Sequence, residues 1–385
     1  MFENYSMKRS LAVACMLLCG ARMAGAQDTT AAKKHWLGKL HPDSIINGKL
    51  SIIPVPVLSS SPETGLRAGV VLQYFFNTGN KADTLRKTRD SYSYLEALYS
   101  TRNQTVFENY TQMYTPGEAF FIKHRMGYAN YNERVWGFGN KTVGANEFEK
   151  VTYTRLYLQS SVARQLKNQL FAGINLNISK TYDVSTVVKD TNLLAGQPGQ
   201  TGSLVVGVGP TLIWDKRDHP MNASRGWYGE LAATWYTGTL GSDYRYTEFL
   251  GDVRKYYTLR DSSVLAFQGY GLLTSGTVPW REKARMGNGT IMRGYFSGRF
   301  RDNQYLAAQA EYRKPVHRWV TLAAFAAVGQ VQHTIGAFTP KDTKLAGGLG
   351  LRVLANKAKR IYLRFDYAVS TDKTSGFYFK VGEAF

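Results

Sequence analysis

The residues of this sequence best suited to chemistry are arginines and carboxylates that alternate with apolar residues in its C-terminal third. Glu311 lies two residues before Arg313, and Arg364 lies two residues before Asp366. In an extended strand, residues two apart point to the same face. Guanidinium and carboxylate groups on one face can form bidentate ion pairs, which hold parts of a protein together. This chemistry positions groups and forms no covalent bond.

Local signatures of catalysis are missing from the sequence. It contains no H-E-x-x-H, C-x-x-C, G-x-x-x-x-G-K or G-x-S-x-G motif. The histidines stand singly, with no i, i+4 pair that could hold a metal: His35, His41, His124, His219, His317 and His333. An esterase or lipid-modifying triad assembled from separate strands stays open, because its members need not be neighbours in sequence. We predict that the protein is no enzyme and needs neither metal nor cofactor.

The N-terminus predicts export. Lys8 and Arg9 precede an apolar run over 11–19, and Ala24-Gly25-Ala26 then offers a small-residue cleavage site. We expect residues 1–26 to be a signal peptide and 27–50 a short periplasmic segment. The two cysteines, Cys15 and Cys19, would leave with the signal peptide.

The chain carries 48 Lys and Arg against 28 Asp and Glu, a net charge of +20. A basic, aromatic-rich chain could bind nucleic acid, but export makes that partner unexpected. Two other uses stay open. The arginines could line an anion-selective pore, or they could pair with Glu230, Asp252, Glu311 and Asp366 to hold an interior together. The candidate arginines are Arg67, Arg155, Arg164, Arg313, Arg352 and Arg364.

Alternation with period two dominates the chain from residue 51 onward, which is typical of strands. In the clearest segment, Ile361, Leu363 and Phe365 alternate with Tyr362, Arg364 and Asp366. Sixteen such segments are expected: 51–59, 64–77, 91–102, 104–115, 119–131, 151–166, 168–183, 201–215, 225–239, 242–259, 262–275, 304–315, 318–331, 343–355, 358–370 and 375–385. Most connections after odd-numbered strands are long, and most after even-numbered strands are two or three residues.

This pattern predicts an all-β fold, a sixteen-stranded antiparallel transmembrane β-barrel over residues 51–385 in the outer membrane of a Gram-negative bacterium. A closed barrel satisfies its backbone hydrogen bonds within lipid, and long loops on one side with tight periplasmic turns on the other are usual for such barrels. A soluble all-β protein is the alternative. Outer membrane lipids and lipopolysaccharide are the expected surroundings.

The end of the chain resembles the recognition signal of bacterial outer-membrane barrels. Phe377, Phe379, Val381 and Phe385 would share one face of a last strand that reaches residue 385. Together with Gly382, the final aromatic residue implies a role in barrel assembly.

Two internal stretches resemble the BamA-like superfamily, which includes BamA and TamA and whose barrels are known as bacterial surface antigen domains. Met292-Arg293-Gly294-Tyr295-Phe296 is similar to the VRGF/Y motif of that family's sixth extracellular loop, and Glu311-Tyr312-Arg313 follows on the next strand. The set Asp215, Arg217, Asp218, Pro220, Gly226 and Tyr228 resembles the family's periplasmic turn between strands eight and nine. Arg293, Gly294 and Tyr295 would then lock the loop in place.

The sequence departs from the family at two points. The segment 27–50 is too short for one of the periplasmic POTRA domains that precede family barrels, so client capture by such domains is not expected. In addition, Ala327 stands where the family's F-x-D-x-G pattern has an acid that pairs with the loop arginine. An unpaired buried guanidinium is costly, so Glu311 and Asp366 are the expected replacement acids.

The resemblance implies a barrel that assists insertion or translocation of protein or lipid at the outer membrane. Client outer membrane proteins, or a separate periplasmic subunit, would be its partners. The alternative is a weakly anion-selective outer membrane pore.

Overall fold

The computed structural model describes residues 52–61, 65–79, 88–187, 192–357 and 360–385. The predicted signal peptide and the segment 27–50 lie outside these residues. The strands are β1 (Ile52–Ser61), β2 (Gly65–Phe76), β3 (Ser91–Ser100), β4 (Thr105–Tyr114), β5 (Phe120–Val135), β6 (Glu149–Lys167), β7 (Leu170–Val187), β8 (Ser203–Asp215), β9 (Gly226–Tyr236), β10 (Tyr246–Thr258), β11 (Val264–Gly276), β12 (Ala284–Arg285), β13 (Arg301–Asp302), β14 (Gln304–His317), β15 (Val320–Gln332), β16 (Lys344–Asn356), β17 (Ile361–Ser370) and β18 (Ser375–Val381). The described residues also contain four short 3₁₀ helices between strands: η4 (Pro116–Glu118), η5 (Gly238–Leu240), η6 (Ile335–Ala337) and η7 (Pro340–Asp342).

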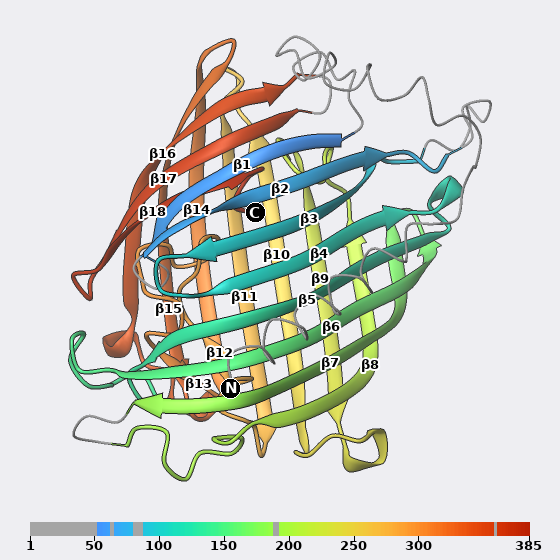
Figure 1. Ribbon diagram of the computed structural model, residues 1–385. Coiled ribbons are helices and arrows are strands. Elements are labelled where there is room, and N and C mark those ends of the chain that lie inside the picture. The colour runs from blue at the N-terminus through green and yellow to red at the C-terminus, as the bar shows by residue number, and fades with distance from the viewer. Residues whose placement is uncertain (1–51, 62–64, 80–87, 188–191, 358–359) are drawn as a thin grey trace, which may run out of the picture. The chain divides into compact units, whose positions relative to one another are not determined.

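Sixteen of these strands form one antiparallel sheet in chain order, as the sequence predicted (Figure 1). The order passes directly from β11 to β14, because β12 and β13 form a separate two-stranded sheet inside the intervening segment. Neighbouring strands of the sheet are therefore consecutive in the chain, apart from the step from β11 to β14. Among the described residues, no helix is long and apolar enough to cross a membrane.

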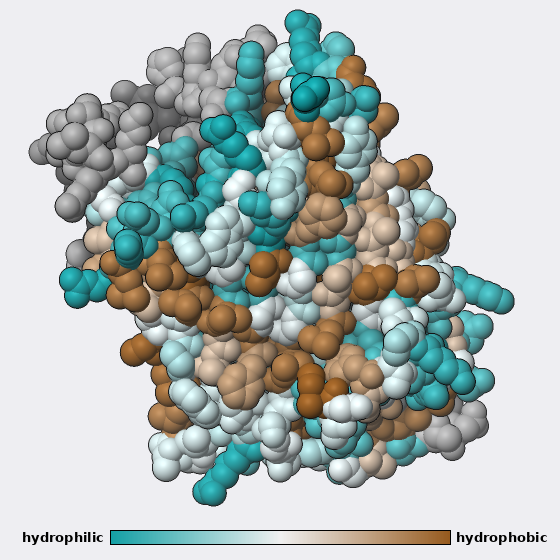
Figure 2. Space-filling view, turned by 180° about the vertical axis from the view of Figure 1, so that it is seen from behind, coloured by the Kyte–Doolittle hydropathy of each residue, from teal (hydrophilic) through white to brown (hydrophobic). Residues whose placement is uncertain are grey.

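Alternate residues of each strand face opposite sides of the barrel wall. In β17, Phe365 and Tyr367 are exposed, whereas Arg364 and Asp366 are buried. On the face shown in Figure 2, hydrophobic residues gather across the middle, and hydrophilic residues lie mainly toward the upper and lower ends. Apolar side chains outside and charged ones inside are what a strand wall needs when lipid is its outer solvent.

The connections have different lengths at the two ends of the barrel. At one end, here called the turn end, β6 and β7 are joined by 168–169 and β14 and β15 by 318–319. At the other, the loop end, the connections 136–148, 188–202, 277–303 and 333–343 are long. The predicted asymmetry is confirmed, and 77–90 and 216–225 are longer connections at the turn end.

The first and last strands lie side by side without a ladder between them among the described residues. Val55 of β1 and its partner Val71 are buried together with Ile361 of β17, and Leu363 and Val381 pack against them. Alternation places Ile361 on the outer face of β17 and Val55 on the inner face of β1. At the turn end, β1 therefore laps over the outside of β17 and β18.

The last strand is shorter than predicted. It ends at Val381, and Gly382 has a positive φ of 81°, a conformation that glycine adopts without strain. The prediction that Phe385 shares the outer face of Phe377 is wrong: Phe377 is 64% exposed, whereas Phe385 is 6% exposed and packs inside the barrel. The chain turns inward because Gly382 interrupts the alternation.

Candidate functional site: an internal loop and its arginine lock

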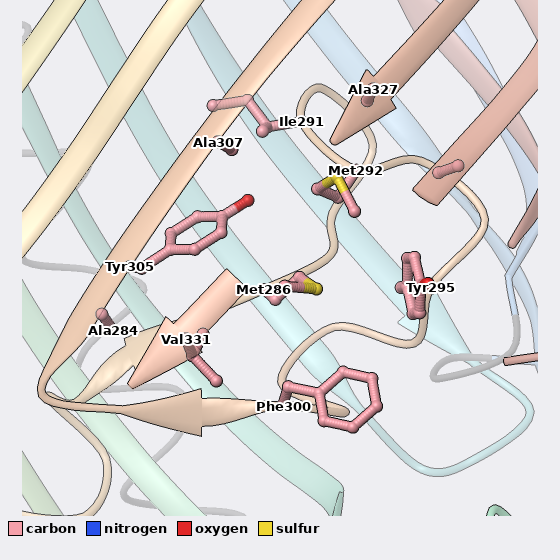
Figure 3. Packing of buried hydrophobic residues seen from close by; sticks show 11 residues of the cluster. Ala284, Met286, Ile291, Met292, Tyr295, Phe300, Tyr305, Ala307, Ala327 and Val331 are labelled. Carbon is pink, nitrogen blue, oxygen red and sulfur yellow. The ribbon is translucent and has the colours of Figure 1, made fainter. Parts of the chain in front are cut away.

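The connection between β11 and β14, residues 277–303, folds into the barrel. Its apolar side chains form one buried cluster with residues of the wall (Figure 3). The loop contributes Ala284, Met286, Ile291, Met292, Tyr295 and Phe300, and β14, β15 and β16 contribute Tyr305, Ala307, Ala327, Val331 and Ala346. The loop is thus held by a core of its own.

Small wall residues make room for the loop. Ala307, Ala327 and Ala346 all face this cluster. A Cβ atom placed on Gly329 would lie only 3.1 Å from the sulfur of Met292. Ala327, where the family has an acid, is therefore part of the apolar surface beneath Met292. The negative charge that pairs with the loop arginine comes from other residues.

Arg293 is the centre of the site. Its Nη1 donates to Asp366 Oδ2 at 2.6 Å, and its Nη2 donates to Glu311 Oε2 at 2.7 Å. The side chains of all three residues have no exposed surface. The guanidinium also lies 3.4 Å from the ring centroid of Phe325, a cation–π contact. The structure thus brings the loop arginine together with the two acids proposed as its partners.

Both acids are shared with other arginines. Glu311 Oε1 accepts from Arg313 Nε at 2.8 Å and from Arg352 Nη2 at 2.9 Å, and Asp366 Oδ1 accepts from Arg352 Nη1 at 2.5 Å. Such sharing matters because a buried charge is tolerated only when it is paired and hydrogen-bonded. Arg293 is therefore one member of a network that spans β14, β16 and β17.

Gly294 and Tyr295 fix the loop backbone beside Arg293. Gly294 has a φ of 105°, and a Cβ atom there would lie 2.8 Å from the backbone carbon of Val369. Its N–H donates to the Tyr378 hydroxyl at 2.9 Å. The Tyr295 hydroxyl donates to the carbonyl of Leu345 at 3.0 Å. The three residues of the RGY motif thus contact every strand from β14 to β18.

The base of the loop is tied to the opposite wall by contacts that the sequence did not predict. Glu282 accepts two bonds of 3.0 Å from Arg155 of β6, and Trp280 is fully buried beside Tyr153. Arg301 pairs with Glu133 of β5. The alternation of residues predicted that Arg155 faces the lumen, but nothing in the local sequence indicated that a carboxylate of the loop would pair with it.

All four candidate acids and four of the six candidate arginines are paired within the described residues. Glu230 pairs with Lys123, and Asp252 with Arg254 at 2.5 Å, so these acids have partners other than the expected arginines. Arg155, Arg313 and Arg352 are each paired, and Arg364 Nε lies 3.6 Å from Asp366. These contacts fit an interior held together by ion pairs better than an open, arginine-lined pore.

The segment from Asp215 to Gly226 forms a compact connection at the turn end. Arg217 donates to Asp215 at 2.8 Å and to the carbonyl of Pro220 at 2.9 Å. Asp218 accepts from the backbone of Ser224 at 2.8 Å. At Gly226, with φ 98°, a Cβ atom would lie 2.0 Å from the Lys216 carbonyl oxygen, so only glycine fits.

Asp218 and His219, both in this turn, have shifted pKa values. Burial, together with the positive charge of Arg360, lowers the pKa of His219 to about 4. Burial alone would raise the pKa of Asp218, but hydrogen bonds from Arg360 and Ser224 outweigh it, and the pKa of the carboxyl is lowered. His219 is thus an acceptor in the folded turn: its Nδ1 accepts from the backbone N–H of Met221 and of Asn222, each at 3.2 Å.

Within the residues that the structure describes, no three His, Cys, Asp or Glu side chains are placed to hold a metal ion. What the site offers is a charged clamp and an apolar bed for one loop. This arrangement fixes a segment within the lumen.

Fold and site together define a sixteen-stranded barrel of the outer-membrane type, with a long loop folded into its lumen. The family model of the Omp85 superfamily domain matches residues 63–385. The chain belongs to the Omp85 superfamily.

Solved structures of similar fold include other barrels of this kind. BamA from Haemophilus ducreyi lacking POTRA domains 1–3 aligns with a TM-score of 0.55 and 12% identity, over 86% of this chain and 70% of that one. CdiB from Escherichia coli aligns with a TM-score of 0.55 and 11% identity, over 86% and 62%. CdiB from Acinetobacter baumannii gives 0.52 and 10%, over 86% and 59%. No curated protein sequence matches. At these identities the likeness concerns the fold, and the chain spans about three fifths of each CdiB.

Proposed function

We propose that this barrel assists the insertion or translocation of protein or lipid at the outer membrane of a Gram-negative bacterium, and that it acts through the seam between β1 and β18. Its membership of the Omp85 superfamily supports this type of function. Lipids and lipopolysaccharide surround it, and client outer membrane proteins or a separate periplasmic subunit are its partners.

The observation that carries the proposal is the way the two edge strands meet. Between β1 and β18 the described residues form no ladder, and Val55 and Val71 instead pack on Ile361 of β17, with Val381 of β18 against them. Apolar contacts are non-directional, so parting them breaks no register of hydrogen bonds. An edge strand freed in this way offers its backbone groups to another chain.

The internal loop supports the same proposal. Its lock ties β14, β16 and β17 into one body, because Arg293 contacts Glu311 and Asp366, and Arg352 joins both acids. A rigid wall beside a weakly joined seam concentrates any deformation of the barrel at the seam.

A reversible lock across the seam tests the proposal. Val55→Cys with Ile361→Cys, joined by a bis-maleimide reagent that carries a reducible disulfide, would tie β1 to β17. The matched control joins Val55→Cys to Val71→Cys, its partner within the β1–β2 ladder. We expect the seam lock to stop assembly of heat-modifiable barrels in outer-membrane fractions, and reduction to restore it. Full assembly by the locked seam variant would refute the proposal.

A weakly anion-selective pore is the second candidate, and the excess of arginines in the lumen network favours it. Four arginines (Arg293, Arg313, Arg352, Arg364) face three carboxylates (Glu311, Asp366, Glu383) there. Stable single-channel conductance in planar bilayers, with a reversal potential that favours chloride over potassium, is the result expected of a pore.

A further inference from the structure

The segment Gly382–Phe385 lies inside the barrel at the turn end and is held there by its backbone. After the turn at Gly382, the Gly382 N–H donates to the Tyr362 carbonyl at 2.8 Å. The Glu383 N–H donates to the carbonyl of Met221, in the connection between β8 and β9, at 3.3 Å. The segment thus reaches from the last strand to the far side of the turn end.

Phe385 fills an apolar pocket there. It is buried in one cluster with Ala223, Tyr256 of β10 and Ala266 of β11. Arg313 closes the pocket: its Nη2 donates to the backbone oxygen of Phe385 at 3.1 Å, and its guanidinium lies 5.6 Å from the phenyl centroid. An aromatic ring and a backbone oxygen are therefore recognised together by one arginine.

Glu383 connects this segment to the loop lock. Its carboxylate accepts from Arg352 Nε at 2.9 Å and lies 3.5 Å from Arg313 Nε. These are the two arginines that also bind Glu311, the carboxylate that holds Arg293. One arginine and one carboxylate thus connect Glu383, at the turn end, to Arg293 of the loop that enters from the loop end.

The charge balance of the arginine network gives the link between Glu383 and the loop an energetic basis as well as a geometric one. With Glu383 in place, three carboxylates face the four arginines of the network, and withdrawal of Glu383 would leave two. Arg352 and Arg313 are almost fully buried, so the lost partner could not be replaced without water or movement. The remaining acids would then be drawn toward Arg352 and Arg313, at the expense of Arg293.

We infer that Glu383-Ala384-Phe385 is a latch that occupies a peptide-binding site in the lumen, and that its departure releases the loop 277–303. The site takes a peptide with a carboxylate two residues before a phenylalanine: Arg313 and Arg352 bind the carboxylate, and the pocket of Ala223, Tyr256 and Ala266 binds the ring. A partner at the turn end that captures this segment would thereby act on the loop.

The reporter for the test is a single thiol in the loop. Ile291 is 7% exposed, and Ile291→Cys, made in a chain whose Cys15 and Cys19 are replaced, should react slowly with a maleimide in the folded barrel. Glu383→Gln keeps the size of the side chain but removes its charge, and Phe385→Ala empties the pocket. The matched control is Asp261→Asn, which removes an exposed carboxylate paired with Lys314 at the same end. Only the folded, heat-modifiable fraction is measured.

We expect Glu383→Gln and Phe385→Ala to raise the labelling rate at position 291 at least tenfold, and Asp261→Asn to leave it unchanged. Added peptide Val-Gly-Glu-Ala-Phe should restore protection of the Phe385→Ala variant, whereas Val-Gly-Gln-Ala-Phe should not. The inference is overturned if folded Glu383→Gln barrels label no faster than the control. It is also overturned if both peptides act alike.

Discussion

Arg352 donates to Glu311 and to Asp366, the same two carboxylates that hold Arg293 of the internal loop. The acids are separated by two strands of the sheet, and the two arginines close a ring with them. A buried ring of this kind is sensitive to loss of any member, because each remaining charge loses part of its compensation. This relationship underlies the first two predictions.

Removal of the loop guanidinium should free the loop. Arg293→Ala leaves Glu311 and Asp366 with less positive charge in a fully buried place, and breaking a buried pair from one side costs about 3 to 5 kcal/mol. We expect a lower melting temperature and protease cleavage within 277–303. Arg293→Lys should recover part of the loss, since one ammonium cannot reproduce the planar fork. Arg318→Ala, in an exposed turn, is the control; equal behaviour of both alanine variants would mean that no lock exists.

Exchange of the charges of Arg293 and Asp366 should not restore the stability of the barrel. A glutamate at position 293 would face Glu311, which now lies 2.7 Å from the loop arginine. An arginine at position 366 would in turn face Arg352. We expect the double variant Arg293→Glu with Asp366→Arg to melt no higher than Arg293→Ala. A melting temperature near that of the wild type would show that the pair acts independently of the ring.

A methyl group at Gly294 should displace the loop. The positive φ of 105° and the distance of 2.8 Å to the Val369 backbone both disfavour any side chain there. Gly294→Ala should destabilise the barrel by about 2 kcal/mol or more and expose the loop to protease. Gly336→Ala is a matched control, because a Cβ atom there has no neighbour within 4 Å. The prediction fails if both variants resist protease equally.

Acid should loosen the turn that contains His219. The pKa of the folded imidazole is about 4, below the usual 6.5, so the unfolded chain takes up the proton first as pH falls. Stability should therefore decrease from pH 6.5 to pH 4, by about 1 to 3 kcal/mol. His219→Asn keeps an acceptor for the turn but does not titrate, so its melting temperature should vary less with pH. Replacement of exposed His317 by Asn should leave the pH dependence as it is.

Deletion of Phe385 should lower the amount of folded barrel in the outer membrane, if this residue directs assembly as the resemblance implies. The inward position of Phe385 gives a second reason for the loss, since Tyr256 and Arg313 would lose a buried neighbour. Refolding of the purified chain in detergent separates the two. A defect confined to cells would indicate recognition, and a defect in detergent as well would indicate packing. Unchanged folding in both would contradict either role.

The sequence by itself determined the wall of this protein. Alternation of side chains along a strand is a local property, so it predicted the sixteen strands, their inner and outer faces and the ends with long connections. It also identified Glu311 and Asp366 as candidate partners of Arg293, because the alternation of their strands placed both side chains inside the barrel. A buried guanidinium needs carboxylate partners, and these two acids were the nearest inward candidates.

Only the tertiary structure decided what crosses the lumen. The pairs Arg155–Glu282 and Glu133–Arg301 depend on the path of the loop, and local sequence does not specify that path. The lap of β1 over β17 and the inward turn at Gly382 depend on how the two ends of the sheet meet. These contacts join residues that are far apart in the chain. They form only when the barrel closes and brings strands from different parts of the chain opposite one another.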